Sequence, residues 1–179
     1  MYQGIALCGR AGTGKDSAYL RLGPDFMRVS FAEQVKILAK QITGVDFLDE
    51  NVKSQPKNRA FLQHLGTDLM RKMWDDDFWV RQAESKCISA LNADFTPVLT
   101  DTRFPNEIEM ARANDYLIVR LEASPETLEQ RGRPMTDHVS ETALPHGPHP
   151  MYDATIHTDN ISPGTVAAVI LDYFHGRVV

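Results

Sequence analysis

The sequence predicts an α/β protein in which a parallel five-stranded sheet is flanked by helices on both faces. Three observations lead to this prediction. Short apolar runs alternate with helical patterns along the whole chain, the 179 residues match the usual size of one domain, and a glycine-rich turn follows the first apolar run. Ligands of such folds bind at the carboxyl ends of the strands, so chemically active residues are expected directly after strands.

In the first part of the chain, apolar spacing predicts two strands, each followed by a helix. The apolar run at 4–8 predicts a buried strand, and the helical pattern at 15–22 ends before a glycine-proline pair. A second strand is predicted at 27–31. Apolar residues then recur at helical spacing from 31 to 42, and Gly44 ends that helix.

In the middle of the chain, two helices precede two further strands. Apolar residues recur at helical spacing over 61–73 and again over 80–91. The compact run at 97–100 predicts a strand that ends in an acidic residue. Pro105 is suited to the first position of a helix, and the apolar run at 116–121 predicts the next strand.

In the last part of the chain, serine-proline pairs start two helices. Ser124 and Ser162 each precede a proline, as a capping residue precedes the first helical position. The segment 132–153 holds four of the ten prolines and three of the six histidines, which predicts a long exposed loop. A last strand is predicted at 154–156.

Composition excludes several classes of protein. Hydrophobic residues at 42% and charged residues at 24% are close to globular averages, which excludes disordered, collagen-like and coiled-coil chains. No apolar run approaches the ~20 residues of a membrane span, and the first residues lack the basic segment of a signal peptide. Two cysteines, Cys8 and Cys87, are too few for a disulfide framework. The net charge of −5 argues against nucleic-acid binding. We expect a cytoplasmic protein with small-molecule partners and no membrane or nucleic-acid partner.

The glycine-rich turn has the G-x-x-x-x-G-K spacing of a Walker A phosphate-binding loop. Its residues are Gly9, Arg10, Ala11, Gly12, Thr13, Gly14, Lys15 and Asp16. Glycines let backbone N–H groups surround phosphate oxygens, the helix that follows adds positive potential, and the lysine reaches the β and γ phosphates. The sequence therefore predicts that this loop binds nucleotide phosphates.

One position departs from the motif. Asp16 stands where a serine or threonine usually ligates Mg²⁺, and Ser17 follows it. Three interpretations stay open. Asp16 binds the metal through a water molecule, Ser17 is the substitute ligand, or Asp16 is an acid at the helix start that the helix dipole favours.

Further segments resemble the deoxynucleoside monophosphate kinases of bacteriophages, which belong to the P-loop nucleoside monophosphate kinases. With the loop at 9–16, these segments are R-A-F-L-Q-H-L-G-T-D at 59–68, D-D-F-W-V at 76–80, D-T-R-F-P-N-E at 101–107, D-H-V-S-E at 137–141 and D-A-T-I-H-T-D-N at 153–160. They keep the family's order and cover nearly the whole chain. The resemblance implies ATP-dependent phosphorylation of deoxynucleoside 5′-monophosphates to diphosphates, with ATP and Mg²⁺.

The resemblance also implies a division of the chain into three parts. The P-loop core is expected at about 1–31, 95–131 and 153–179, an acceptor-binding helical insert at about 32–94 and a lid at about 131–152. Transfer of a γ-phosphoryl group requires positioning and positive charge, and the predicted catalytic residues are Lys15, Arg103 and Arg131, with Arg133 close by. Arg131 and Asn160 are also expected in the ATP site. Asp101 resembles a Walker B acid, so the expected metal ligands are Asp16, Ser17 and Asp101; a helix-capping role is the alternative for Asp101.

The acceptor site is expected on a helix face that carries Arg59 and Gln63, which lie four residues apart. By the resemblance, Arg59 binds the acceptor phosphate and Gln63 lies near the base. The other residues of this expected site are Asp68, Arg71, Trp74, Trp79, Arg103 and Glu107. The alternatives are a solvated, salt-bridged face, core packing for the tryptophans and a helix-start role for Glu107.

Other functions stay open at this point. Another small-molecule P-loop kinase, such as phosphomevalonate kinase, and a non-catalytic nucleotide-sensing module are the alternatives, while a GTPase would need an N-K-x-D signature that is absent. The sequence leaves open a homodimer, the accepted bases and the sugar preference. A phage-encoded chain is expected in the host cytoplasm. His138, Ser140 and Glu141 recur in the resembling family without an assigned role.

Overall fold

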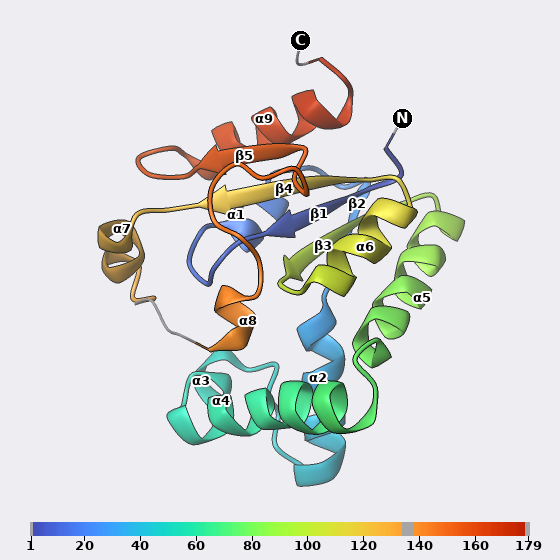
Figure 1. The fold of residues 1–179 in the computed structure, drawn as a ribbon, viewed down its shortest axis with the longest axis vertical. Helices are drawn as coiled ribbons and strands as arrows, with labels where there is room; N and C mark the ends of the chain where they lie inside the picture. Colours follow the sequence, from blue (N-terminus) through green and yellow to red (C-terminus); the bar gives the residue numbers. More distant parts are fainter. Residues whose placement is uncertain (1, 134–137, 178–179) are drawn as a thin grey trace. The chain divides into compact units, whose positions relative to one another are not determined.

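Five parallel strands form a sheet in the order β2-β3-β1-β4-β5 in the computed structural model, which describes residues 2–133 and 138–177 (Figure 1). This arrangement confirms the predicted α/β class and the parallel five-stranded sheet. The strands are β1 Gly4–Cys8, β2 Phe26–Val29, β3 Thr96–Thr102, β4 Tyr116–Glu122 and β5 Ala154–His157. All five residues of β1 are buried, as expected for the central strand of a sheet that is covered on both faces.

The chain divides into two compact units, one formed by residues 1–29 and 87–179 and the other by residues 30–86. The first unit contains the sheet, and the second is helical. The division falls within helix α5 (Phe78–Asn92). No helix in the described part of the chain is long and apolar enough to cross a membrane.

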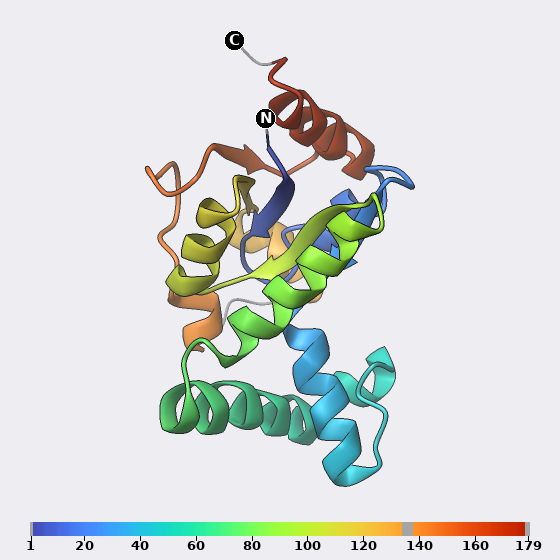
Figure 2. The same ribbon diagram turned by 90° about the vertical axis from the view of Figure 1, so that its right-hand side faces the viewer.

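Helices cover both faces of the sheet in the first unit (Figures 1 and 2). Helices α1 (Lys15–Tyr19) and α9 (Pro163–Phe174) pack together on one face, and α6 (Pro105–Ala113) packs against β1 and β4 on the other. Helix α7 (Pro125–Gln130) follows β4, and α8 (Val139–Thr142) precedes β5. The core joins apolar side chains of the strands to those of α9, among them Val166, Ala167 and Ile170.

Local capping explains where several helices begin. The hydroxyl groups of Ser124 and Ser162 accept the backbone N–H of Thr127 and Thr165, which confirms both predicted serine caps. Ser30 caps helix α2 (Phe31–Thr43) in the same way. Because Ser30 and Phe31 belong to this helix start, the second strand ends at Val29 rather than at residue 31 as predicted.

In the second unit, helix α4 (Pro56–Gln63) continues directly into the π-helix η1 (His64–Trp74), and the two form one rod (Figure 2). The short helix α3 (Glu50–Lys53) precedes them. Gly66 of η1 lies against Val35 of α2, and a Cβ atom at Gly66 would lie 3.3 Å from both Cγ atoms of that valine. The glycine of the L-G-T string therefore stands where η1 and α2 approach each other closely.

Two expectations about local structure are corrected. Residues 61–73 were expected to continue one helical period, but from His64 onward the chain is wound as a π-helix, in which each N–H bonds to the carbonyl five residues earlier. The expected exposed loop at 132–153 contains α8, and Glu141, Leu144 and Tyr152 within it are buried. Residues 134–137, which include Asp137 of the D-H-V-S-E string and part of the expected lid, lie outside the described residues.

Candidate functional site

The glycine-rich turn runs between β1 and α1 at the carboxyl edge of the sheet. Gly9, Gly12 and Gly14 have φ angles of 138°, 87° and 93°, which side-chain-bearing residues rarely adopt. At Gly9 a Cβ atom would lie only 2.3 Å from the carbonyl oxygen of Leu121 in β4. Backbone shape and close packing together explain why glycine is needed at this position.

Lys15 is buried inside the loop. Its Nζ donates hydrogen bonds to the carbonyl oxygens of Gly9 and Arg10, both at 2.7 Å. Burial, assisted by the charge of Arg103, lowers the pKa of Lys15 to about 7. A polyphosphate at this position would restore the charged form of the amine.

Asp16 forms an ion pair that the sequence did not predict. Its Oδ1 lies 3.0 Å from Nη2 of Arg28, and Nε of Arg28 donates to Oγ1 of Thr100 at 3.0 Å. Arg28 stands near the carboxyl end of β2, where parallel strands bring their ligand-binding residues, and this position was the signal available in the sequence. In this structure the Asp16 carboxylate is exposed and pairs with Arg28. Ser17 is exposed beside it on α1.

The acidic residues of this edge fit a magnesium site that the nucleotide completes. Asp101 lies within β3, one residue before the end of the strand, which the sequence had predicted to end at Asp101. Asp16 and Asp101 both stand close enough to Lys15 to raise its pKa against the effect of burial. No cluster of three or more candidate ligands occurs among the described residues. Mg²⁺ is commonly bound by one or two carboxylates together with water and substrate phosphates, so this donor set suits it.

Arg131 joins the loop to the chain after β5. Its Nη1 donates to the carbonyl oxygen of Gly12 at 2.9 Å, and its Nη2 donates to the carbonyl oxygen of Thr158 at 2.9 Å. Arg133 also passes close to the loop, because a Cβ atom at Gly12 would lie 2.8 Å from its Cβ. Asn160 is exposed two residues beyond Thr158. The structure thus brings together Arg131, Gly12 and the segment before Asn160.

Glu107 fixes the turn that carries Arg103. The Glu107 carboxylate is buried and accepts the backbone N–H groups of Arg103 and Phe104 at 2.6 and 3.1 Å. The bond from the Phe104 N–H is the carboxylate half of a capping box at the start of α6, since the phenylalanine side chain cannot accept the reciprocal bond. These bonds favour the helix-start alternative for Glu107, and its acceptor contact stays a prediction.

Glu141 comes to the loop from α8. Its Oε2 accepts the Ala11 N–H at 2.8 Å, and its Oε1 pairs with Nη1 of Arg103. Burial raises the pKa of the Glu141 carboxyl, but the Arg103 charge, the Ala11 N–H and the Lys15 charge together bring the pKa below its ordinary value. The carboxylate is therefore ionised at neutral pH.

His146, which follows α8, makes a second contact between this part of the chain and the glycine-rich turn. Its Nε2 lies 3.1 Å from Nη2 of Arg10, and its Nδ1 lies 3.0 Å from Nη2 of the buried Arg120. Burial, Arg120 and Arg10 lower the pKa of His146. A histidine between two guanidinium groups is thus held neutral, and it places Arg10 over the end of β4.

The helical unit exposes part of the expected acceptor set. Arg59 is exposed on α4, Gln63 is half-buried, and Trp74 at the end of η1 is 77% exposed. Asp68 accepts hydrogen bonds from Lys72 and His64 at 2.8 and 3.1 Å, so its carboxylate belongs to ion pairs on the helix surface.

Two residues of that set are structural in this unit. Trp79 is 3% exposed, and its indole N–H donates to the carbonyl oxygen of Gly66 at 2.9 Å. Arg71 is buried and donates to the carbonyl oxygen of Asp76 at 3.0 Å, which holds the acidic turn after η1. The burial of Trp79 favours its core-packing alternative, the burial of Arg71 disagrees with a solvated surface position, and the acceptor contacts of both residues stay predictions.

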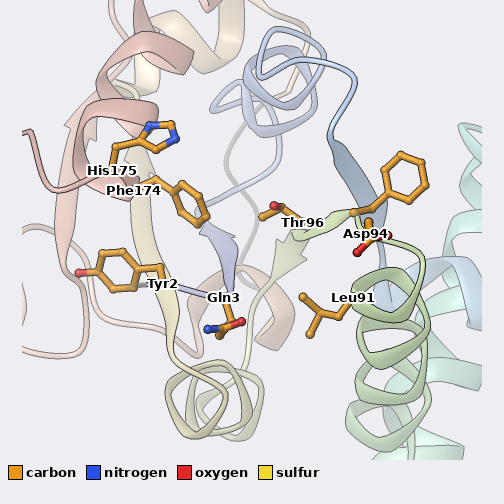
Figure 3. Close-up of a pocket in the computed structure, with 8 residues that line it drawn as sticks. Tyr2, Gln3, Leu91, Asp94, Thr96, Phe174 and His175 are labelled. Atoms are coloured by element: carbon orange, nitrogen blue, oxygen red, sulfur yellow. The ribbon is translucent and has the colours of Figure 1, made fainter.

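A separate cavity lies at the opposite edge of the sheet, where the strands begin (Figure 3). Its lining is largely aromatic and apolar and comes from the residues before β1, the end of α5, the turn into β3 and the end of α9, among them Tyr2, Leu91, Thr96 and Phe174. Because the glycine-rich turn follows the end of β1, this cavity is not part of the phosphate site.

Comparisons with known proteins agree with this geometry. A profile of the family described as "Deoxynucleotide monophosphate kinase" matches residues 5–161. A protein of Escherichia phage RB69 described as "Deoxynucleotide monophosphate kinase" is 29% identical over a match 124 residues long, with 62% of this chain and 48% of the phage protein covered. The chain thus spans about half the length of that relative.

Solved structures of kinases share the fold. A sugar kinase from Janibacter sp. HTCC2649 has a TM-score of 0.60 and 14% identity, with 98% of this chain and 95% of that chain covered. Shikimate kinase from Aquifex aeolicus vf5 has a TM-score of 0.54 and 14% identity, with coverage of 97% and 96%. At this identity the likeness shows the fold alone, and it confirms the predicted P-loop kinase fold.

Proposed function

The chain belongs to the deoxynucleotide monophosphate kinase family, and on that premise we propose that it transfers the γ-phosphoryl group of ATP to a deoxynucleoside 5′-monophosphate. The observation that carries the proposal is the loop itself, which surrounds the buried Lys15 amine and has Arg103 and Arg131 beside it. In the reaction, the bond between the γ phosphorus and the β–γ bridging oxygen breaks. A phosphate oxygen of the acceptor forms the new bond to phosphorus, and ADP and a deoxynucleoside diphosphate are released.

The protein contributes position and charge to this reaction rather than covalent chemistry. We propose that the N–H groups of residues 9–15 bind the ATP phosphates and that Lys15 neutralises the transferred group. Arg131, which contacts Gly12 and Thr158, and Asn160 complete the donor site in this proposal. Arg103 is proposed to bridge the donor and acceptor phosphates, because its planar guanidinium suits two phosphate groups at once.

Mg²⁺ would be held by Asp101, with Asp16 or Ser17, and would neutralise charge on the bound phosphates. On the protein side, the Arg28 ion pair keeps the Asp16 carboxylate at the start of α1, beside the loop.

The acceptor nucleotide is proposed to bind the exposed face of α4. Arg59 would bind its phosphate and Gln63 its base, with Trp74 as a stacking surface. Among the described residues the Arg59 guanidinium makes no ion pair, whereas Asp68 on η1 pairs with Lys72 and accepts a hydrogen bond from His64. This difference supports Arg59 as the group that meets a ligand and leaves Asp68 a surface role.

A substrate panel tests the proposed function. The protein is mixed with ATP, Mg²⁺ and, separately, each of the four common deoxynucleoside monophosphates, their ribose counterparts and phosphomevalonate, and ADP release is measured. We expect at least one deoxynucleoside monophosphate to raise ADP release well above the rate with ATP alone. Turnover only with phosphomevalonate, or ATP binding without turnover on any acceptor, would contradict the proposal. The Lys15→Ala variant controls for a contaminating kinase.

A further inference from the structure

Glu141 is a buried carboxylate at the phosphate-binding loop, and it belongs to none of the proposed donor, acceptor or metal sites. Its side chain is only 6% exposed, and both of its oxygens have donors, one from Ala11 and one from Arg103. A carboxylate is buried at a tolerable cost only when it is paired and hydrogen-bonded in this way. The contact is therefore specific, although its partners Ala11 and Arg103 lie 130 and 38 residues away in the sequence.

Residues of the D-H-V-S-E string hold the turn that carries this carboxylate through local hydrogen bonds. Nδ1 of His138 accepts the Ser140 N–H at 3.2 Å, and the Glu141 N–H donates to the carbonyl oxygen of His138 at 2.8 Å. The capped turn directs a second acceptor at Arg103, because the Ser140 carbonyl oxygen lies 3.4 Å from the same Nη1. Short helix α8 thus presents two acceptors to one guanidinium group.

Resting on the kinase function proposed above, we propose that Glu141 is a positioning residue for phosphoryl transfer, which fixes the Arg103 guanidinium beside the phosphate-binding loop. A free arginine side chain has many rotamers, and this freedom has to be lost when it binds phosphate. An arginine that is already held needs little reordering when the phosphate arrives, and preorganised charge is the main source of rate enhancement in this class of reaction.

The contact between Glu141 and Ala11 has a competing explanation, which predicts a different effect when the Glu141 charge is removed. A carboxylate on the Ala11 N–H stands where a phosphate oxygen could bind, so Glu141 could act as a stand-in anion that ATP has to displace. Removal of the charge would then tighten ATP binding. Removal of a positioning group would instead lower kcat and leave ATP affinity nearly constant.

The Glu141→Gln variant separates the two explanations, because glutamine keeps the shape and an acceptor for the Ala11 N–H but loses the charge that holds Arg103. We expect kcat to fall at least ~10-fold while the KM for ATP changes less than ~3-fold. Glu109→Gln, an exposed glutamate of α6, is the matched control and should keep wild-type kinetics. In the Arg103→Ala background, Glu141→Gln should lower kcat little further, because the group through which it acts is gone.

A second measurement does not depend on turnover. Side-chain NMR spectra of arginine in the nucleotide-free protein should show Nη signals of Arg103 that are resolved by restricted rotation in the wild type and averaged in Glu141→Gln. If circular dichroism shows that the Glu141→Gln variant is unfolded, Glu141→Asp replaces it, since the shorter side chain should also lower kcat and release Arg103.

Any of three kinetic results would overturn the proposal: an unchanged kcat, a KM for ATP that falls several-fold at constant kcat, or additive losses in the Arg103→Ala background. Unchanged Arg103 signals in the variant would do so as well. A wild-type protein without activity on any acceptor would overturn the proposed function instead, while the NMR spectra still decide whether Glu141 fixes Arg103.

Discussion

Nζ of Lys15 donates a hydrogen bond to the carbonyl oxygen of Gly9 at 2.7 Å, so the amine is held inside the loop by the strand end that precedes it. If this amine neutralises the transferred phosphate, Lys15→Ala should lower kcat by at least ~100-fold. The fold should survive, because the change removes a buried amine and leaves the glycine backbone intact. Steady-state kinetics and circular dichroism check both statements, and wild-type turnover in a folded variant would contradict the role of Lys15.

Proton uptake on ATP binding should reveal the lowered pKa of Lys15. With a pKa of about 7, the amine is mostly neutral at pH 8 in the free protein and charged at pH 6. Bound phosphate favours the ammonium form, so a non-hydrolysable ATP analogue should take up close to one proton at pH 8 and almost none at pH 6. Its affinity should accordingly fall as the pH rises above 7.

Calorimetry of the analogue in buffers of different ionisation enthalpy measures this uptake. Lys15→Ala is the control and should lose the buffer dependence at pH 8. Equal uptake in the wild type and in this variant would assign the proton to another group.

Magnesium titrations should distinguish the two acidic residues near Lys15. Asp101→Asn should raise the Mg²⁺ concentration needed for half-maximal rate, because a carboxylate ligand of the metal is lost. Asp16→Asn should shift it less, since the Asp16 carboxylate already pairs with Arg28 at 3.0 Å. A larger shift for Asp16→Asn would assign the metal to that side of the loop, and an unchanged titration for Asp101→Asn would make Asp101 structural.

The two tryptophans should respond differently to phenylalanine. Trp79→Phe removes the buried N–H that satisfies the Gly66 carbonyl oxygen, and we expect it to lower the free energy of unfolding by about 1–3 kcal/mol. Trp74 is 77% exposed, so Trp74→Phe should change stability by about 0.5 kcal/mol or less. Denaturant unfolding checks both values, and equal effects would contradict the burial of Trp79.

Most of the fold could be predicted from local patterns. The strands follow apolar runs, and Ser124 and Ser162 cap helices as their serine-proline pairs indicated, because both signals act within a few residues. The π-helix was not predictable in this way. Apolar spacing was interpreted with an α-helical period, and Arg71, which was expected in the same acceptor site as Arg59, is buried in the π-helix.

The candidate site was predictable only where one short segment carries it. The loop at 9–16 can be recognised from its G-x-x-x-x-G-K spacing alone. The roles of Arg28 and Glu141 depend instead on partners that only the fold brings close. Glu107 has the helix-start role that the sequence left open as an alternative, because its carboxylate accepts the backbone N–H groups of Arg103 and Phe104 at the start of α6.

The acceptor phosphate is common to all nucleotide substrates, and this fact gives Arg59→Ala a distinct signature. Loss of one charge-assisted hydrogen bond should weaken every acceptor by a similar amount, roughly 1.5–3 kcal/mol. Kinetics on the four common deoxynucleoside monophosphates measure this loss. Lys57→Ala on the same helix is the control, and a change confined to the KM for ATP would contradict the placement of Arg59.

Gln63 is proposed to face the base, whose donors and acceptors differ from one nucleotide to another. Gln63→Ala should therefore change the ranking among the four substrates more than their mean rate, because an amide that pairs with one base is indifferent or unfavourable to another. ATP affinity should stay nearly constant, since the donor phosphates bind the loop at 9–15 in the proposed function. The ratio of kcat/KM values in the variant and the wild type decides the matter for each substrate. If that ratio is equal for all four, Gln63 does not contact the base, and the acceptor lies on another part of the helical unit even though the kinase function stands.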